Sequence, residues 1–166
     1  MEAASETNGL ASIASQVRCP PNALQEAVAT YVMSLLTRSP RQMWQLRGGI
    51  GKSRSIAYCG LIGLLSLGLP RVHFVLPNKM LMQRELQEFG DYWRLSQSED
   101  RVAYHCAFDF QHEPGELIII DEADFLVLKN PGSVAEFLGE TNVIGFSSSL
   151  NETKHRDMEA TVLRDL

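Results

Sequence analysis

The chain has 166 residues, 45% of them hydrophobic and 21% charged, with a formal net charge of −5. This size and composition predict one folded domain whose core needs no disulfide or structural metal. The negative charge argues against broad attraction to nucleic acid or anionic membrane, although a local basic strip stays compatible with it. Three cysteines without a CxxC pair favour a reducing, intracellular compartment, cytoplasmic or nuclear. The longest apolar stretch is too short to span a bilayer, so we expect no membrane partner.

The elements that the sequence predicts alternate between helices and strands. Residues 1–19, rich in Ala, Ser and Glu, are expected to form a flexible N-terminal tail, and the folded domain is expected over 20–150. In chain order the domain should contain a helix at 23–37, a strand at 43–46, a helix from 52 to Gly68, a strand at 72–76, a helix with Met82, Leu86, Phe89 and Trp93 on one face, strands at 102–106 and 117–120, a short helix at 133–138 and a strand at 143–146. Residues 151–166 are expected to form a charged helical segment.

The strand at 117–120 reads Leu-Ile-Ile-Ile and is too apolar to be half exposed. Such strands are typical of parallel sheets that are covered on both faces. Together with the alternation, this predicts a three-layer α/β fold with a mainly parallel sheet. Ligands of such sheets bind at the carboxyl ends of the strands, where residues after 46 and after 120 would meet.

A glycine-rich segment follows the first predicted strand, with the sequence Arg-Gly-Gly-Ile-Gly-Lys-Ser at 47–53. Backbone N–H groups of such a loop, and the helix N-terminus behind it, can cradle a triphosphate. Lys52 should reach the β- and γ-phosphates, and the Ser53 hydroxyl should bind Mg²⁺. The predicted nucleotide-binding residues are Gly48, Gly49, Ile50, Gly51, Lys52 and Ser53. The motif is the shorter G-x-G-K-S form, because position 46 is Leu rather than Gly.

An acidic run, Asp-Glu-Ala-Asp at 121–124, directly follows the predicted strand at 117–120. A nucleoside triphosphatase needs one carboxylate to hold Mg²⁺ and another to orient or deprotonate the attacking water. Asp121 suits the first role and Glu122 the second, so Lys52 and Glu122 are the candidate catalytic residues. The alternative for this pair is capping of the turn after the strand. For Asp124, a solvated or capping role is as good an interpretation as a functional one.

These motifs resemble those of the first RecA-like domain of superfamily 2 helicases and translocases, the class that includes DEAD-box proteins. Residues 49–53 match motif I, 121–124 match motif II, 147–149 resemble motif III and 76–79 resemble motif Ia. The resemblance implies a RecA-like P-loop domain with five or more strands, the cofactors ATP and Mg²⁺, and RNA or DNA as partner. It also implies that Gln25 reads the adenine edge. The pattern Asn22-x-x-Gln25 is equally a helix capping box.

The sequence also departs from the family. It lacks a Thr-Pro-Gly-Arg motif, and the second RecA-like domain, which supplies arginine fingers in the family, does not follow residues 147–149. An arginine finger is worth roughly 10³–10⁵ in rate, so little hydrolysis is expected without a second domain in trans or in a longer parent chain. Two alternatives stay open: a catalytically silent nucleotide-binding scaffold, and the ATPase domain of a protein-translocating motor.

Overall fold

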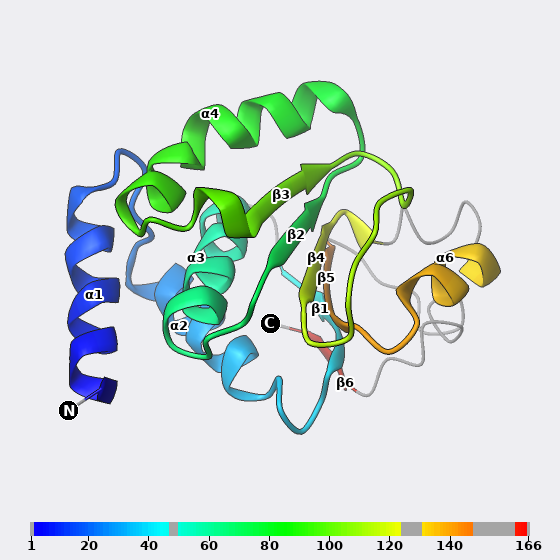
Figure 1. Ribbon diagram of the computed structural model, residues 1–166, viewed down its shortest axis with the longest axis horizontal. Coiled ribbons are helices and arrows are strands. Elements are labelled where there is room, and N and C mark those ends of the chain that lie inside the picture. Colours follow the sequence, from blue (N-terminus) through cyan, green and yellow to red (C-terminus); the bar gives the residue numbers. More distant parts are fainter. Residues whose placement is uncertain (1, 47–49, 124–130, 148–161, 166) are drawn as a thin grey trace.

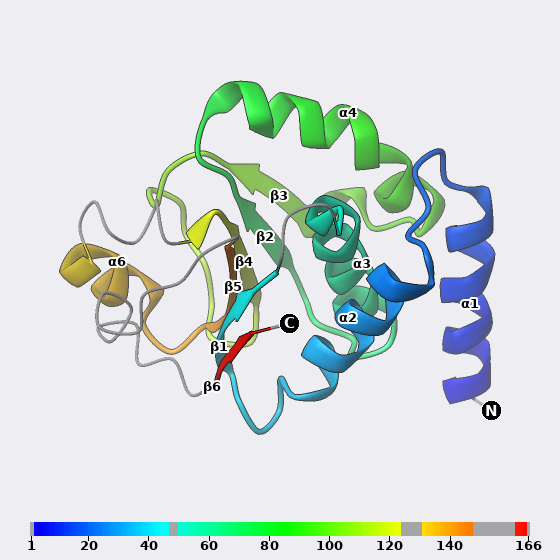
Figure 2. The same ribbon diagram turned by 180° about the vertical axis from the view of Figure 1, so that it is seen from behind.

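The computed structural model describes residues 2–46, 50–123, 131–147 and 162–165. Its helices are α1 (Glu2–Gln16), α2 (Ala23–Ser34), α3 (Lys52–Leu65), α4 (Lys79–Leu95) and α6 (Pro131–Leu138), with a short 3-10 helix η1 (Glu99–Arg101). Its strands are β1 (Arg41–Gln45), β2 (Val72–Val75), β3 (Val102–His105), β4 (Leu117–Asp121), β5 (Asn142–Ser147) and β6 (Val162–Asp165). Figure 1 shows α1 to α4 on one side of the sheet and α6 on the other, and Figure 2 shows the same three layers from behind.

The strands within the described residues form one sheet in the order β3-β2-β4-β5-β1-β6, and every neighbouring pair is parallel. This confirms the predicted three-layer α/β fold with a parallel sheet. All carboxyl ends of the strands therefore lie along one edge of the sheet. The ends of β1 and β4, which precede the two predicted site motifs, are separated only by β5.

The core has two halves, one on each face of the sheet. Strand β4 contributes to both, because successive side chains of a strand point to opposite faces. Leu117 and Ile119 pack into the cluster under α1 to α4, and Ile118 and Ile120 pack into the cluster under α6. All four side chains are fully buried, as the sequence of this strand predicts. Among the described residues, no helix is long and apolar enough to cross a membrane.

The N-terminal segment differs from the prediction of a flexible tail, because it forms helix α1. Ile13 and Val17 are buried, and Leu10 and Ala14 pack partly against the same core. These four residues follow the i, i+3, i+4, i+7 spacing of an amphipathic helix. The prediction was wrong because it used the overall Ala, Ser and Glu content of residues 1–19. The four apolar residues at helical spacing contribute little to that overall content.

The C-terminal segment also differs from the prediction of a helix. Residues 162–165 form β6, which pairs in parallel with β1 from Gln42 to Gln45. Pairing satisfies the backbone N–H and C=O groups that an edge strand leaves open, and this contact is not visible in local sequence patterns. Residues 151–161 lie outside the described part of the chain.

Candidate functional site

The loop before α3 ends at Gly51, which is the N-cap of this helix. Its φ of 78° lies in the left-handed region, where a residue without Cβ is strongly favoured. A Cβ on Gly51 would lie 2.5 Å from Nε2 of Gln25. Both observations explain the glycine directly before the lysine, and they bring the loop against α2.

Gln25 connects α2 with this loop. Its Nε2 donates hydrogen bonds to the carbonyl oxygens of Ile50 (2.8 Å) and Gly51 (3.1 Å), and its side chain is buried. Its Oε1 accepts a hydrogen bond from the backbone N–H of Asn22, which completes the capping box of α2. The Ser55 hydroxyl of α3 donates to the Gln25 carbonyl at 3.1 Å. In the structure Gln25 thus supports the loop. Its recognition of adenine stays a prediction. For that role, the side-chain amide would have to exchange one or more of these hydrogen bonds for bonds to the base.

Lys52, the first residue of α3, reaches across the sheet edge to the end of β4. Its Nζ lies 3.3 Å from Oδ1 of Asp121 and makes an ion pair with Oε1 of Glu122. Burial alone lowers the pKa of Lys52, but the two neighbouring carboxylates outweigh it and raise the pKa above its ordinary value. The lysine therefore stays charged at neutral pH, and the fold brings together residues 70 positions apart in the sequence.

The two carboxylates lie at a turn of the backbone where β4 ends. Glu122 has a φ of 53°, and its backbone N–H donates to Oδ1 of Asp121 at 2.9 Å. Burial raises the pKa of Asp121 and Glu122 raises it further, while Lys52 lowers it in part. A buried carboxylate beside a second one is a position that favours a cation.

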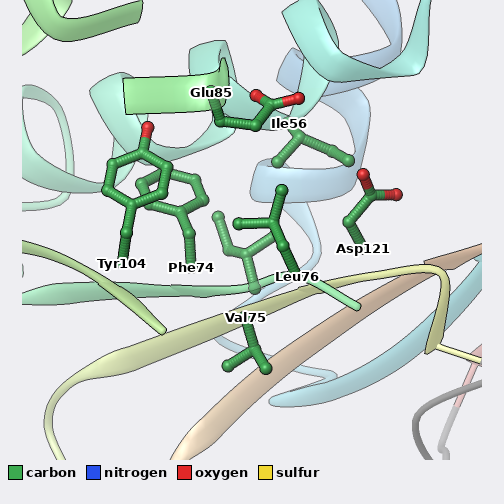
Figure 3. A pocket seen from close by; sticks show the side chains of 8 residues that line it. Ile56, Phe74, Val75, Leu76, Glu85, Tyr104 and Asp121 are labelled. Carbon is green, nitrogen blue, oxygen red and sulfur yellow. The ribbon is translucent and has the colours of Figure 1, made fainter. Parts of the chain in front are cut away.

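A third carboxylate, Glu85 of α4, lies near this cluster and was missed by sequence reasoning. It lines a small cavity with Asp121, Ile56, Phe74, Val75, Leu76, Tyr104 and Ile119 (Figure 3). Burial raises its pKa to about 7, and the neighbouring Asp121 carboxylate contributes in the same direction. The prediction for this helix placed Leu86 on the inward face, but Leu86 is 44% exposed and Glu85 faces inward instead. The i, i+4 spacing of Leu81, Glu85 and Phe89 was the available signal.

The donor set that the structure brings together suits magnesium. Mg²⁺ prefers oxygen ligands and is usually held by one or two protein groups plus phosphates and water. The hydroxyl of Ser53 and the carboxylate of Asp121 are such groups. Among the described residues, no three or more His, Cys, Asp and Glu side chains are grouped so that they could hold a metal. The protein would thus supply few ligands to a magnesium ion here, and the triphosphate and water would supply the others.

The predicted site residues that the structure describes form one group: Gln25, Ile50, Gly51, Lys52, Ser53, Asp121 and Glu122. Gly48, Gly49, Asp124, Ser148 and Ser149 lie outside the described residues. Ser147 is buried at the end of β5, and its carbonyl accepts a hydrogen bond from the backbone N–H of Leu46 at 2.9 Å. This contact ties the strand before the predicted motif III to the strand before the loop.

No protein-family model matches this sequence, and no curated protein matches it significantly. Solved structures do match in fold. The UvsW helicase from bacteriophage T4 superimposes with a TM-score of 0.65 at 16% identity, over 90% of this chain and 61% of that one. Yeast Dbp5 bound to RNA and ADP BeF3 gives a TM-score of 0.65 at 18% identity, over 96% of this chain and 49% of that one.

A third match is the Sulfolobus solfataricus SWI2/SNF2 ATPase core in complex with dsDNA, with a TM-score of 0.62 and 15% identity. It covers 84% of this chain and 34% of the other. The chain therefore spans only a part of each of these proteins. The similarity is one of fold: residues of this chain build the RecA-like α/β architecture that these three proteins also contain.

Proposed function

We propose that this chain is a helicase-type P-loop domain that binds Mg-ATP. The single observation that carries the proposal is the meeting of Lys52 with Asp121 and Glu122 at the carboxyl edge of the sheet. A phosphate-binding lysine at a helix N-terminus and a carboxylate pair after a buried strand are the two parts that a nucleoside triphosphatase needs. Nothing in the apolar packing of the core requires these charges to be adjacent.

Different residues of the candidate site would serve ATP binding and ATP hydrolysis. The N-terminus of α3 and the ammonium of Lys52 would bind the phosphates, whose negative charges compete with Glu122 for the lysine. Glu122, freed from this ion pair, would orient the attacking water and accept its proton. Ser53 and Asp121 would hold Mg²⁺, which neutralises phosphate charge when bound. Gln25 would hold the loop in position through its bonds to Ile50 and Gly51.

We further propose that the domain acts on RNA or DNA together with a second RecA-like domain, in trans or in a longer parent chain. The fold is shared with a helicase, with a protein bound to RNA and with an ATPase core bound to dsDNA, which supports this partner class. A second domain would supply an arginine for the transition-state charge, so slow hydrolysis is expected for this chain alone.

The test is a calorimetric titration with Mg-ATP of the wild-type chain, Lys52→Ala and the control Arg94→Ala. Arg94 is an exposed cation in the last turn of α4, at the opposite end from the site, so its variant matches the loss of one positive charge. Wild type and the control should bind with equal affinity, and Lys52→Ala should bind on the order of 100-fold more weakly. Equal affinity in all three proteins would overturn the proposal.

Hydrolysis is a separate measurement. Phosphate release with RNA or DNA and an added second domain should rise above the rate of the chain alone. Tight ATP binding without hydrolysis under all these conditions would instead favour the scaffold interpretation. Stimulation by polypeptide but not by nucleic acid would favour a protein-translocating motor.

A further inference from the structure

Gly145 of β5 has no side chain in the middle of a row of buried ones. Its neighbours in register are Ile120 on β4 and Met43 on β1. Both side chains are fully buried in the cluster under α6, and Figure 2 shows β5 between their two strands. A glycine inside a strand often marks a place where another part of the chain approaches the backbone closely.

Ala123 occupies the space that a side chain at position 145 would need. A Cβ on Gly145 would lie 2.9 Å from the Cβ of Ala123 and 2.5 Å from the Sδ of Met43. The sulfur belongs to a flexible side chain that can adopt another rotamer. The Cβ of Ala123 is attached directly to the backbone, so it can move only with the chain. Because Ala123 is fully buried in the same cluster, its methyl group packs directly on the backbone of β5.

The packing of Ala123 bears on the residue before it. Glu122 has a φ of 53°, in the left-handed region, and a residue with a Cβ keeps such a conformation only where the surrounding structure holds it. On one side of Glu122, the Asp121 carboxylate accepts its backbone N–H at 2.9 Å. On the other side, Ala123 is fixed by its contact with β5. The contact therefore helps to keep both carboxylates at the ammonium of Lys52.

Building on the proposed function, we propose that Gly145 is a positioning residue of the nucleotide site. It leaves room on β5 for the methyl group of Ala123, and this packing holds Asp121 and Glu122 where they serve Mg²⁺ and the attacking water. Gly145 acts through Ala123 and would contact neither the nucleotide nor the metal. The alternative is that Gly145 only makes room for the side chain of Met43, which would be a role in core packing alone.

The experiment moves one methyl group between the two positions. Wild type has this methyl at position 123 only. Gly145→Ala places a methyl at both positions, and Ala123→Gly leaves neither position with one. The double variant, with Ala123→Gly and Gly145→Ala, has a methyl at position 145 only. Met43 must adjust to the new Cβ in both variants that contain Gly145→Ala, so the difference between these two isolates the contact with Ala123.

ATP binding is measured by calorimetry in excess Mg²⁺ and in excess EDTA, and the melting temperature is measured without nucleotide. In wild type, Mg²⁺ should tighten ATP binding. We expect Gly145→Ala to melt at a lower temperature and to lose on the order of tenfold of this magnesium-dependent gain, with no weakening in EDTA, because the displaced carboxylates no longer meet the cation. Ala123→Gly should lose a smaller part of the gain. The double variant should recover most of the gain and of the melting temperature that Gly145→Ala loses.

Val143→Ala is the matched control. Val143 lies two residues before Gly145 on the same face of β5 and is buried in the same cluster under α6. Its truncation should lower the melting temperature, because it leaves a cavity in this cluster. The magnesium-dependent gain should stay at the wild-type value, which separates general destabilisation from displacement of the carboxylates.

Two results for the folded variants would overturn the inference while the proposed function stands. If Gly145→Ala keeps the gain, or weakens binding equally in Mg²⁺ and in EDTA, Gly145 does not position the carboxylates. If the double variant does not recover the gain, the new Cβ acts through Met43 and not through Ala123. If Gly145→Ala does not fold, folding of the double variant with the gain retained supports the inference, and failure of both variants to fold overturns it. Absence of ATP binding by the wild-type chain would instead remove the proposed function, and this inference with it.

Discussion

The sheet carries two clusters of polar side chains, and they are built in opposite ways. The histidine cluster consists of His73 on β2, His105 on β3 and Glu116, which directly precedes β4. His73 joins it through both ring nitrogens: Nδ1 lies 3.0 Å from Nε2 of His105, and Nε2 lies 2.7 Å from Oε1 of Glu116. Phe110 stacks on His105 with 3.6 Å between ring centroids. Burial lowers the pKa of both histidines, for His105 to about 4, so the rings are neutral at neutral pH.

The nucleotide-site cluster of Lys52, Glu85, Asp121 and Glu122 has three carboxylates and one ammonium. In the histidine cluster each ring N–H can be matched to an acceptor, since Glu116 accepts from His73 and His73 accepts from His105. Such a neutral network stabilises the fold. The nucleotide-site cluster instead holds like charges together at a cost in stability, which Lys52 offsets in part and which a bound Mg²⁺ would offset further under the proposed function. Polar side chains that satisfy one another thus serve the fold, whereas carboxylates held together in excess over their cations indicate a candidate functional site.

Loss of His73 should produce the largest change in stability. His73→Ala removes a buried ring and takes from the Glu116 carboxylate its side-chain hydrogen-bond partner, so the free energy of unfolding should fall by about 2–4 kcal/mol. Urea denaturation measures this loss. The affinity for Mg-ATP should stay at the wild-type value. A weaker affinity in the folded variant would mean that the histidine cluster also affects nucleotide binding.

Gly51→Ala should lower stability by about 1–2 kcal/mol, because the left-handed backbone and the contact with Gln25 both oppose a Cβ. The loop would shift, so ATP affinity should fall as well. The control is Gly90→Ala within α4, where a Cβ meets nothing within 4 Å. This variant should gain about 0.5–1 kcal/mol and should bind ATP like wild type. A neutral effect of Gly51→Ala in both assays would contradict the loop geometry.

Asp121→Asn should raise stability by about 0.5–1 kcal/mol near pH 7 while it removes the effect of Mg²⁺ on ATP binding. The pKa of Asp121 is raised in the folded state, so its ionised form destabilises the fold at neutral pH. The advantage of the variant should therefore shrink as the pH falls and wild-type Asp121 takes up its proton. Urea midpoints at neutral and acidic pH measure both effects. A destabilised variant would mean that the pairing with Lys52 outweighs the burial of the carboxylate.

The smallest expected effect is a pH dependence from the histidine cluster. The pKa values of His73 and His105 are lowered by folding, so the unfolded chain binds more protons than the folded chain between about pH 6.5 and pH 4. Stability should thus fall as the pH decreases through this range. Urea midpoints for wild type and His105→Phe would show it, since the variant has one titrating ring fewer. Parallel curves for the two proteins would exclude His105 as a source of this dependence.

Local patterns predicted most of the sheet and the paired site motifs. The apolar run at 117–120 and the Gly-Lys-Ser turn after β1 each depend on a few adjacent residues. Such short patterns can be recognised in the sequence without knowledge of the three-dimensional structure. Other features depend on contacts between distant segments. The packing of Ile13 and Val17 on the core, the pairing of 162–165 with β1 and the position of Glu85 in one cavity with Asp121 could not be read from composition. Helical spacing held the signal for the first and the third.

The turn at Glu122 has a consequence for how this motif tolerates change. In an extended strand, Asp121 and Glu122 would point to opposite faces of the sheet. The left-handed backbone at Glu122 redirects the chain, so that both carboxylates meet the same ammonium. Insertion of a single residue between Asp121 and Glu122 would keep both acids and still separate the two charges. The spacing of the two acids therefore matters here as much as their identity, and a chain with one residue between them would not form this site.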